Sequence, residues 1–138
     1  MAASPSGRDS GAVPEVIRLL VADDSPVVRR GLIHLLADRT EFVVVGEAEN
    51  GRVAISLVQV LEPDVVLLDI SMPVLDGLAA ARVLAGMEKG PAVVLFSAWA
   101  DPRRLAQAAA AGVHGHVLKD APAEELLTML RAAAGRPY

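Results

Sequence analysis

The chain has 138 residues, of which 53% are hydrophobic and 22% charged, and its net charge is −4 at pH 7. This length suits one domain with a hydrophobic core. The net negative charge argues against a domain that grips nucleic acid by itself, because such a domain usually offers a basic face. No apolar run approaches the roughly 18 residues of a membrane span. The absence of cysteine excludes disulfides and thiolate metal sites and is consistent with a cytoplasmic location.

Strand and helix patterns alternate along most of the chain. Residues 1–14, rich in Ser, Gly, Pro and Ala, predict a disordered leader that lacks the apolar centre of a signal peptide. Residues 15–134 form one predicted domain, and residues 135–138 are interpreted as the start of a linker. In chain order, we expect strands and helices alternately at about 16–23, 26–38, 42–48, 51–61, 64–69, 77–88, 92–98, 102–111, 115–119 and 122–134.

This alternation predicts an α/β fold. Strands that alternate with helices form a parallel sheet with helices on both faces. Five such units suit a flavodoxin-like (βα)5 fold, which is a doubly wound parallel five-stranded sheet of order 2-1-3-4-5. Local signals agree: Ser25 can cap the first helix, Pro26 suits its first position, and Gly112 can stop the fourth helix.

Polar residues stand at the ends of four apolar, strand-like runs. These residues are Asp24, Asp69, Ser97 and Lys119, and Asp23 directly precedes the first of them. The carboxyl ends of parallel strands meet at one edge of the sheet, where ligands bind. We therefore expect carboxylates, a hydroxyl and an ammonium to converge in one crevice. Each residue alone is typical of a turn or a surface, so the prediction depends on the joint pattern.

The chemistry of this set favours phosphoryl transfer to an aspartate. Clustered carboxylates repel one another, and a hard cation such as Mg²⁺, which prefers oxygen ligands, relieves that repulsion. Asp69 can then act as a nucleophile toward a phosphoryl group and become an aspartyl phosphate. Ser97 and Lys119 can neutralise the peripheral oxygens of the transition state.

The same residues lie in motifs of a known family. The chain resembles the receiver domain of bacterial two-component response regulators over about residues 16–134. The segments that carry the resemblance are VADDSPVVRRGL (21–32), VVLLDISMPVLDGL (65–78), VVLFSA (93–98) and AAGVHGHVLKD (110–120).

The spacing of the strand-end residues narrows the resemblance. Asp69 follows Asp24 by 45 positions. Ser97 follows Asp69 by 28 positions, and Lys119 follows Ser97 by 22. These spacings are similar to those of the NarL/LuxR-type subgroup, in which the output domain is a helix-turn-helix.

The resemblance implies a phosphoacceptor and a metal site. Asp69 would be the phosphoacceptor. Asp24 and Asp69 would bind Mg²⁺ directly, together with the backbone carbonyl of Ser71. Asp23 would act on the metal through water.

The resemblance also implies switch and access residues. Ser97 would be the switch hydroxyl and Lys119 the partner of the phosphoryl group. The family often has Tyr or Phe three residues before the lysine, where this chain has His116. One interpretation of His116 is a neutral, half-exposed strand residue. In the alternative, His116 moves inward with Ser97, and activation weakens as pH falls through the His pKa. Ala98 and Trp99 would control access to the site, and an overhanging Trp99 indole would lengthen the phosphoryl lifetime.

The implied function is a phosphorylation-controlled switch rather than an enzyme with free substrates. A sensor histidine kinase would supply the phosphoryl group, and the domain would catalyse only its own phosphorylation and dephosphorylation. Phosphorylation would promote a homodimer, through the helices at 26–38 and 122–134 or through the face at 102–134. Transcription regulation would depend on a DNA-binding helix-turn-helix beyond Tyr138, and no membrane partner is expected.

Other functions remain open from the sequence alone. A stand-alone receiver would act through protein–protein contacts. A phosphatase of the haloacid-dehalogenase type would use an aspartate nucleophile, but it typically needs a second acid where Ser71 stands. A flavin or nucleotide module on the same topology usually has a glycine-rich loop after the first strand, and here that segment reads ADDSPVV. A phosphate-independent pseudo-receiver is disfavoured by the intact acidic set.

Overall fold

The structure, a computed structural model, describes residues 16–98 and 101–135. Its strands form one parallel sheet of order β2-β1-β3-β4-β5, as predicted. The strands are β1 (Ile17–Ala22), β2 (Phe42–Ala48), β3 (Val65–Asp69), β4 (Ala92–Ser97) and β5 (Gly115–Leu118). The helices are α1 (Pro26–Ala37), α2 (Gly51–Leu61), α3 (Gly77–Ala85), α4 (Pro102–Ala111) and α5 (Ala123–Ala133). The predicted leader at 1–14, most of the predicted linker and Trp99 lie outside the described residues.

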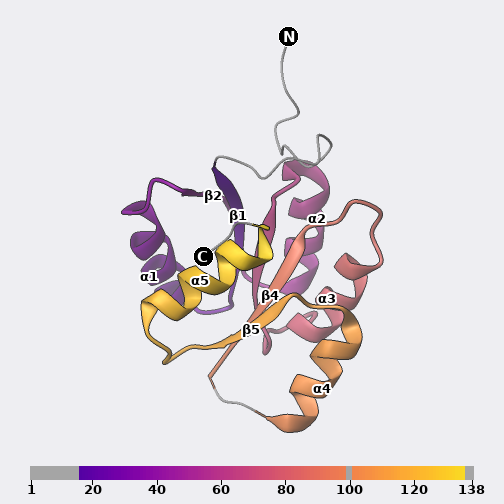
Figure 1. The fold of residues 1–138 in the computed structure, drawn as a ribbon. Coiled ribbons are helices and arrows are strands. Elements are labelled where there is room, and N and C mark those ends of the chain that lie inside the picture. Colours follow the sequence, from indigo (N-terminus) through magenta and orange to yellow (C-terminus); the bar gives the residue numbers. More distant parts are fainter. Residues whose placement is uncertain (1–15, 99–100, 136–138) are drawn as a thin grey trace.

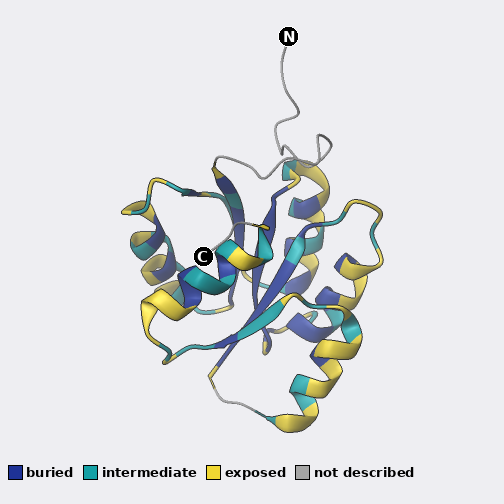
Figure 2. Ribbon diagram, in the orientation of Figure 1, coloured by how far each residue is buried: buried dark blue, intermediate teal, exposed yellow. Residues whose placement is uncertain are grey.

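The sheet is covered on both faces (Figure 1). Apolar side chains of α1 and α5 pack on one face, and those of α2, α3 and α4 pack on the other. Neighbouring residues of β1 alternate between the two cores: Leu19 and Val21 lie in one, Leu20 and Ala22 in the other. A strand buried on both faces reads as an unbroken apolar run, and Figure 2 shows β1, β3 and β4 as buried.

Side-chain caps begin four of the helices at the carboxyl edge of the sheet. Ser25 accepts a hydrogen bond from the Val28 N–H at 3.2 Å, which caps α1 as the sequence predicted. The carboxylates or amides of Asn50, Asp76 and Asp101 cap α2, α3 and α4 in the same way. Each cap fixes the first turn of a helix that begins at the carboxyl edge.

One element is shorter than predicted. α3 ends at Ala85 rather than near residue 88. Gly86, a poor helix former, occupies the C-cap, and the next turn closes with a hydrogen bond from the Met87 N–H to the Leu84 carbonyl over three residues. Lys89 then adopts a positive φ of 57°, which turns the chain toward β4. Among the described residues, none of the helices has both the length and the apolar character that a membrane span requires.

Candidate phosphoryl-transfer site

Three carboxylates meet at the carboxyl edge of the sheet. Asp69 ends the central strand β3, while Asp23 and Asp24 follow β1, which pairs directly with β3. One carboxylate oxygen from each of the three lies within 4.8 Å of the others. Asp23 and Asp69 are buried, with 0% and 4% exposure, whereas Asp24 is exposed. The structure therefore brings together the acidic set that the strand ends predicted.

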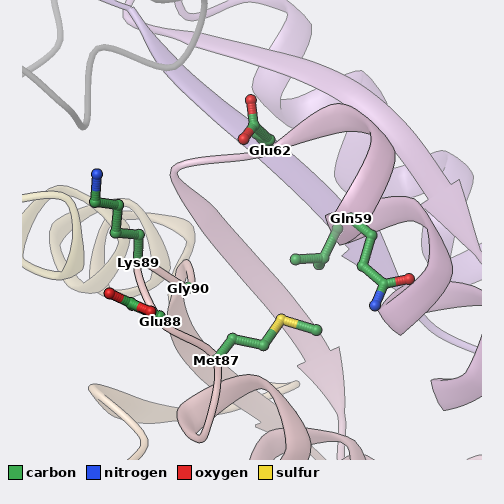
Figure 3. A pocket seen from close by; sticks show the side chains of 7 residues that line it. Gln59, Glu62, Met87, Glu88, Lys89 and Gly90 are labelled. Atoms are coloured by element: carbon green, nitrogen blue, oxygen red, sulfur yellow. The ribbon is translucent and has the colours of Figure 1, made fainter.

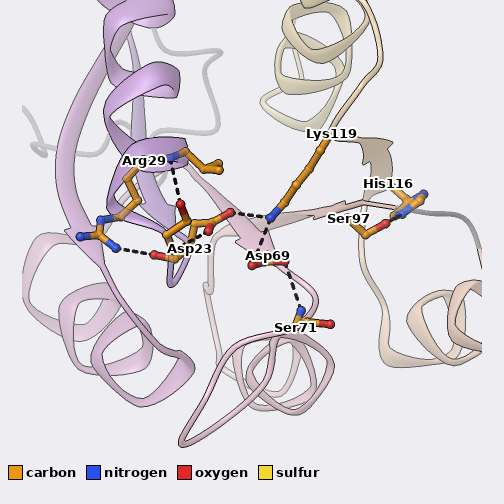
Figure 4. A network of polar contacts seen from close by, with 9 residues as sticks. Asp23, Arg29, Asp69, Ser71, Ser97, His116 and Lys119 are labelled. Carbon is orange, nitrogen blue, oxygen red and sulfur yellow. Dashed lines mark hydrogen bonds and ion pairs between the residues drawn. The ribbon is translucent and has the colours of Figure 1, made fainter.

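Lys119 enters this group from the opposite side. Its Nζ lies 2.9 Å from Asp23 Oδ2 and 3.3 Å from Asp69 Oδ2. Figure 4 shows the side chain reaching from the end of β5 to a point between the two carboxylates. The Lys119 backbone N–H donates to the Ser97 carbonyl at 2.7 Å, so the β4–β5 pairing fixes where the lysine begins. The ammonium also lies 5.7 Å from the centre of the Phe96 ring.

Burial and charge work against each other in this group. Burial raises the pKa of Asp69, and the charge of Asp23 adds to that effect, although the Ser71 N–H and Lys119 act to lower it. For Lys119, burial opposes the charged form. The hydrogen bond to Asp23 and the charges of Asp69 and Asp23 outweigh burial, so the pKa of Lys119 is raised. The charged form of Lys119 is therefore favoured, whereas the charged form of Asp69 is disfavoured in the metal-free site.

The backbone around the acids is held tightly. Asp69 Oδ1 accepts a hydrogen bond from the Ser71 N–H at 3.2 Å, and Asp23 Oδ1 accepts one from the Ser25 N–H at 2.9 Å. The loop after β3 returns against the strand, where the Gly77 N–H donates to the Ile70 carbonyl at 3.0 Å. A Cβ on Gly77 would collide with the Asp69 carbonyl, so this close approach requires glycine.

The donor set fits a hard divalent cation. Three carboxylates converge, and the ammonium of Lys119 compensates only part of their charge. Carboxylate oxygens are the ligands that Mg²⁺ prefers, and Mg²⁺ commonly keeps several waters, so a partly exposed acid such as Asp24 suits it. Ser71 is an exposed loop residue beside Asp69; its carbonyl as a metal ligand stays a prediction.

Comparison with known proteins decides the family. Residues 19–131 match the model of the response regulator receiver domain. The chain belongs to this family. The receiver domain of NarL from Mycobacterium tuberculosis has a solved structure with a TM-score of 0.82 and 38% identity, covering 89% of this chain and 100% of that one. The flavodoxin-like fold and the NarL-type resemblance are thereby confirmed.

Curated relatives extend further than this receiver domain. The nitrate/nitrite response regulator protein NarL of Escherichia coli (strain K12) is 36% identical over 120 residues, which are 87% of this chain and 56% of that protein. The transcriptional regulatory protein YdfI of Bacillus subtilis (strain 168) is 34% identical over 116 residues, or 84% and 54%. The chain thus spans a little over half the length of these relatives.

The hydroxyl of Ser97, predicted to be the switch group, lies at the end of β4 beside β5. Ser97 ends β4 with 3% exposure, and its Oγ lies 2.7 Å from His116 Nε2. His116 is half-buried, and burial lowers the pKa of its imidazole. Ala98 is exposed at the start of the loop that follows. Trp99, expected to overhang the site, lies outside the described residues, so its shielding role stays a prediction.

Two arginines near the site were not predicted from the sequence. Arg29 Nη1 donates to the Asp23 carbonyl at 2.5 Å, and its Nε pairs with Glu47 at 3.2 Å, which ties α1 to the loop after β1 and to β2. Arg104 of α4 lines a cavity beside Ser97. The only available signal was that each arginine lies in the first turn of a helix that starts at the carboxyl edge. Most such arginines simply face solvent.

Proposed function

We propose that this receiver domain is phosphorylated on Asp69 by a sensor histidine kinase and works as a phosphorylation-controlled switch. The observation that carries the proposal is the placement of Lys119 between two buried carboxylates that adjoin an exposed third one. Buried carboxylates are costly unless positive charge compensates them, and one ammonium offsets only part of the charge of the three acids, so the site favours an added cation. The alternative phosphatase is disfavoured, because the structure has the exposed Ser71 where that class needs its second acid.

In this proposal Asp24 and Asp69 would hold Mg²⁺ with the Ser71 carbonyl, and Asp23 would act through water. The metal supplies positive charge for the oxygens of the incoming phosphoryl group. Asp23 Oδ1 is already engaged by the Ser25 N–H, while its Oδ2 faces Lys119. Asp69 is engaged in the same way by the Ser71 N–H and by Lys119, so the indirect role proposed for Asp23 rests on the family resemblance.

Each residue of the site then has a separate role in phosphoryl transfer. A carboxylate oxygen of Asp69 forms a bond to phosphorus as the P–N bond of the donor phosphohistidine breaks. The departing imidazole nitrogen keeps the electron pair and takes up a proton. Lys119 exchanges its contact with Asp69 for a phosphoryl oxygen, and the Ser97 hydroxyl donates to another. The central position of β3 keeps Asp69 fixed while these partners move.

The exposed face of α1 supports a protein partner close to the site. Val27, in the first turn of α1, is 79% exposed. A surface hollow of about 680 Å³ follows the same face and is lined by Val27, Arg30, Gly31, His34, Leu35 and Asp38. One exposed apolar side chain is common on protein surfaces, so the support for an interface comes from the combination of Val27 with the hollow beside it. We infer that α1 takes part in protein recognition, either by the kinase or in a phosphorylation-dependent homodimer.

The curated relatives support a proposal for the output of the intact protein. Both curated relatives are named as regulators and are longer than this chain. We infer transcription regulation in the cytoplasm through a DNA-binding domain that phosphorylation controls. A stand-alone receiver is the second possibility, and the downstream coding sequence distinguishes the two.

Acetyl phosphate labelling tests the proposed function. With Mg²⁺ present, the intact mass should rise by one phosphoryl group, and excess EDTA should prevent the rise. Asp69→Asn should abolish labelling. Asp64→Asn changes another buried acid, which lies at the opposite edge of the sheet, and it should be labelled like the wild type. Equal labelling of Asp69→Asn and the wild type would overturn the assignment.

A further inference from the structure

The geometry around Ser97 suggests a role for His116 that is separate from phosphorylation itself. Ser97 Oγ and His116 Nε2 are 2.7 Å apart in the described structure. Figure 4 shows His116 on the side of Ser97 that faces away from Asp69. The hydroxyl that would contact a phosphoryl oxygen is thus engaged by the neighbouring strand.

The sheet register explains why these two side chains meet. In the β4–β5 pairing, Leu95 lies opposite His116 and Ser97 lies opposite Leu118. Side chains two positions apart on a strand share a face of the sheet. Ser97 and His116 are therefore diagonal neighbours on one face, the face on which Leu95 packs with α2, α3 and α4. A side chain three positions before Lys119 can reach Ser97 because of this register.

The chemistry of the pair creates competition for the hydroxyl. A serine hydroxyl has one hydrogen to donate. A phosphoryl oxygen only accepts, so Ser97 must donate that hydrogen to reach it. Burial favours the neutral imidazole of His116, and a neutral imidazole has one nitrogen that accepts and one that donates. In either tautomer the contact with Nε2 fixes the position of Oγ, and when Nε2 accepts it also takes the hydrogen that the phosphoryl group needs.

Space beside the pair allows a second arrangement. A cavity of about 120 Å³ adjoins the two residues, and Ser71 and Arg104 are among those that line it. Within the described part of the chain, Arg104 Nη1 is buried without a hydrogen-bond partner. The imidazole can therefore leave Ser97 without displacing the packed core, and the cavity offers polar surroundings to receive it.

We propose that His116 is a positioning residue that holds the Ser97 hydroxyl away from the phosphoryl site until Asp69 is phosphorylated. The proposal rests on the proposed function, since it gives the contact a role only in a receiver that is phosphorylated. His116 then sets the threshold of activation: breaking its hydrogen bond opposes the change that the phosphoryl group drives. This role is opposite to an inward movement that helps activation.

The test is a double-mutant cycle on the affinity for beryllofluoride, a phosphoryl mimic, measured by calorimetry with saturating Mg²⁺. The four proteins are the wild type, His116→Phe, Ser97→Ala and the double variant. Phenylalanine keeps an aromatic ring but cannot engage Ser97. His116→Phe should bind about fivefold more tightly than the wild type, the factor expected for one net hydrogen bond. In the Ser97→Ala background the same change should have no effect.

A conservative variant separates the hydrogen bond from packing. The amide of His116→Gln can reach Ser97, so this variant should return toward the wild-type affinity. The ¹⁵N shift of His116 Nε2 should also change on beryllofluoride binding, because its partner leaves. Equal affinity of His116→Phe and the wild type, or an equal gain with and without Ser97, would overturn the positioning role alone. A wild type that binds no beryllofluoride would overturn the proposed function and this inference with it.

Discussion

The two edges of the sheet both contain buried acids, yet they differ in how those acids are satisfied. At the amino edge, Asp64 stands just before β3 with 7% exposure, and its carboxylate accepts the Arg18 N–H at 2.9 Å. The Arg18 guanidinium donates to the Glu62 carbonyl at 2.7 Å. At the carboxyl edge, Asp23 and Asp69 face each other with Lys119 between them.

A buried carboxylate by itself therefore does not indicate a functional site. Asp64 bonds to backbone and holds two strands in place, whereas Asp69 shares its surroundings with other charges. The amino edge also has a hollow of about 310 Å³, which Figure 3 shows between Glu62 and the segment at 87–90. No cluster of carboxylates with metal-ligand spacing occurs there in the described ranges. Convergence of charges, rather than burial or hollow space, distinguishes the functional edge.

The largest expected effect is a loss of Mg²⁺ affinity in a variant of the carboxyl edge but not in a variant of the amino edge. Asp23→Asn should weaken Mg²⁺ binding by about 10- to 100-fold, the usual cost of losing an outer-sphere carboxylate. Asp64→Asn should leave the affinity unchanged, because Asp64 lies at the other edge. Calorimetric titration with MgCl₂ measures both variants. Equal losses in both would mean that the edges do not differ as described.

Two glycines provide the next comparison. Gly77→Ala forces a Cβ against the Asp69 carbonyl, and Gly90→Ala forces one against the Leu84 carbonyl at the amino edge. Each should cost about 1–3 kcal/mol in the free energy of unfolding, as overpacking does. Only Gly77→Ala should also slow acetyl phosphate labelling of the folded protein. Urea unfolding and labelling kinetics check the pair, and slow labelling of both variants would contradict the comparison.

The acids themselves should have opposite effects on stability. Asp64→Ala leaves the Arg18 N–H without its acceptor and should cost about 1–3 kcal/mol. Asp69→Asn removes a buried charge beside Asp23 and should stabilise the metal-free fold. Urea unfolding in EDTA at neutral pH measures both, with Asp64→Asn as the control that keeps an acceptor. Destabilisation by Asp69→Asn would show that its ion pair with Lys119 outweighs burial.

The smallest effect concerns pH. Burial lowers the folded-state pKa of His116 below the ordinary value of 6.5, so the unfolded chain takes up the proton first. The free energy of unfolding should therefore fall as pH drops from about 6.5 toward the folded-state pKa. His116→Phe should remove the contribution of His116 to this dependence of the free energy of unfolding on pH, while His34 and His114 remain in both proteins. If the urea midpoints of the wild type and His116→Phe depend on pH in the same way between about pH 5.5 and 8, His116 does not contribute to the pH dependence of stability.

The sequence predicted which residues gather at the carboxyl edge of the sheet better than it predicted the contacts between their side chains. The polar residues that end the apolar runs lie far apart in the sequence. The parallel strand order alone is enough to bring them to one edge: Asp24, Asp69, Ser97 and Lys119. α3 is about a turn shorter than predicted, because Gly86 is a poor helix former and occupies the C-cap of the helix. The contact between Ser97 and His116 depends on β4–β5 register and on side-chain rotamers. Neither of these follows from the apolar pattern.

The most direct measurement is the position of the phosphoryl group. Borohydride reduction of the labelled protein converts an aspartyl phosphate to homoserine, and peptide mass spectrometry then locates the changed residue. We predict homoserine at position 69 alone, with Asp23, Asp24 and Asp64 intact. Homoserine at position 64, or a label that survives borohydride without any homoserine, would contradict the claim that the carboxyl edge is the phosphoacceptor site.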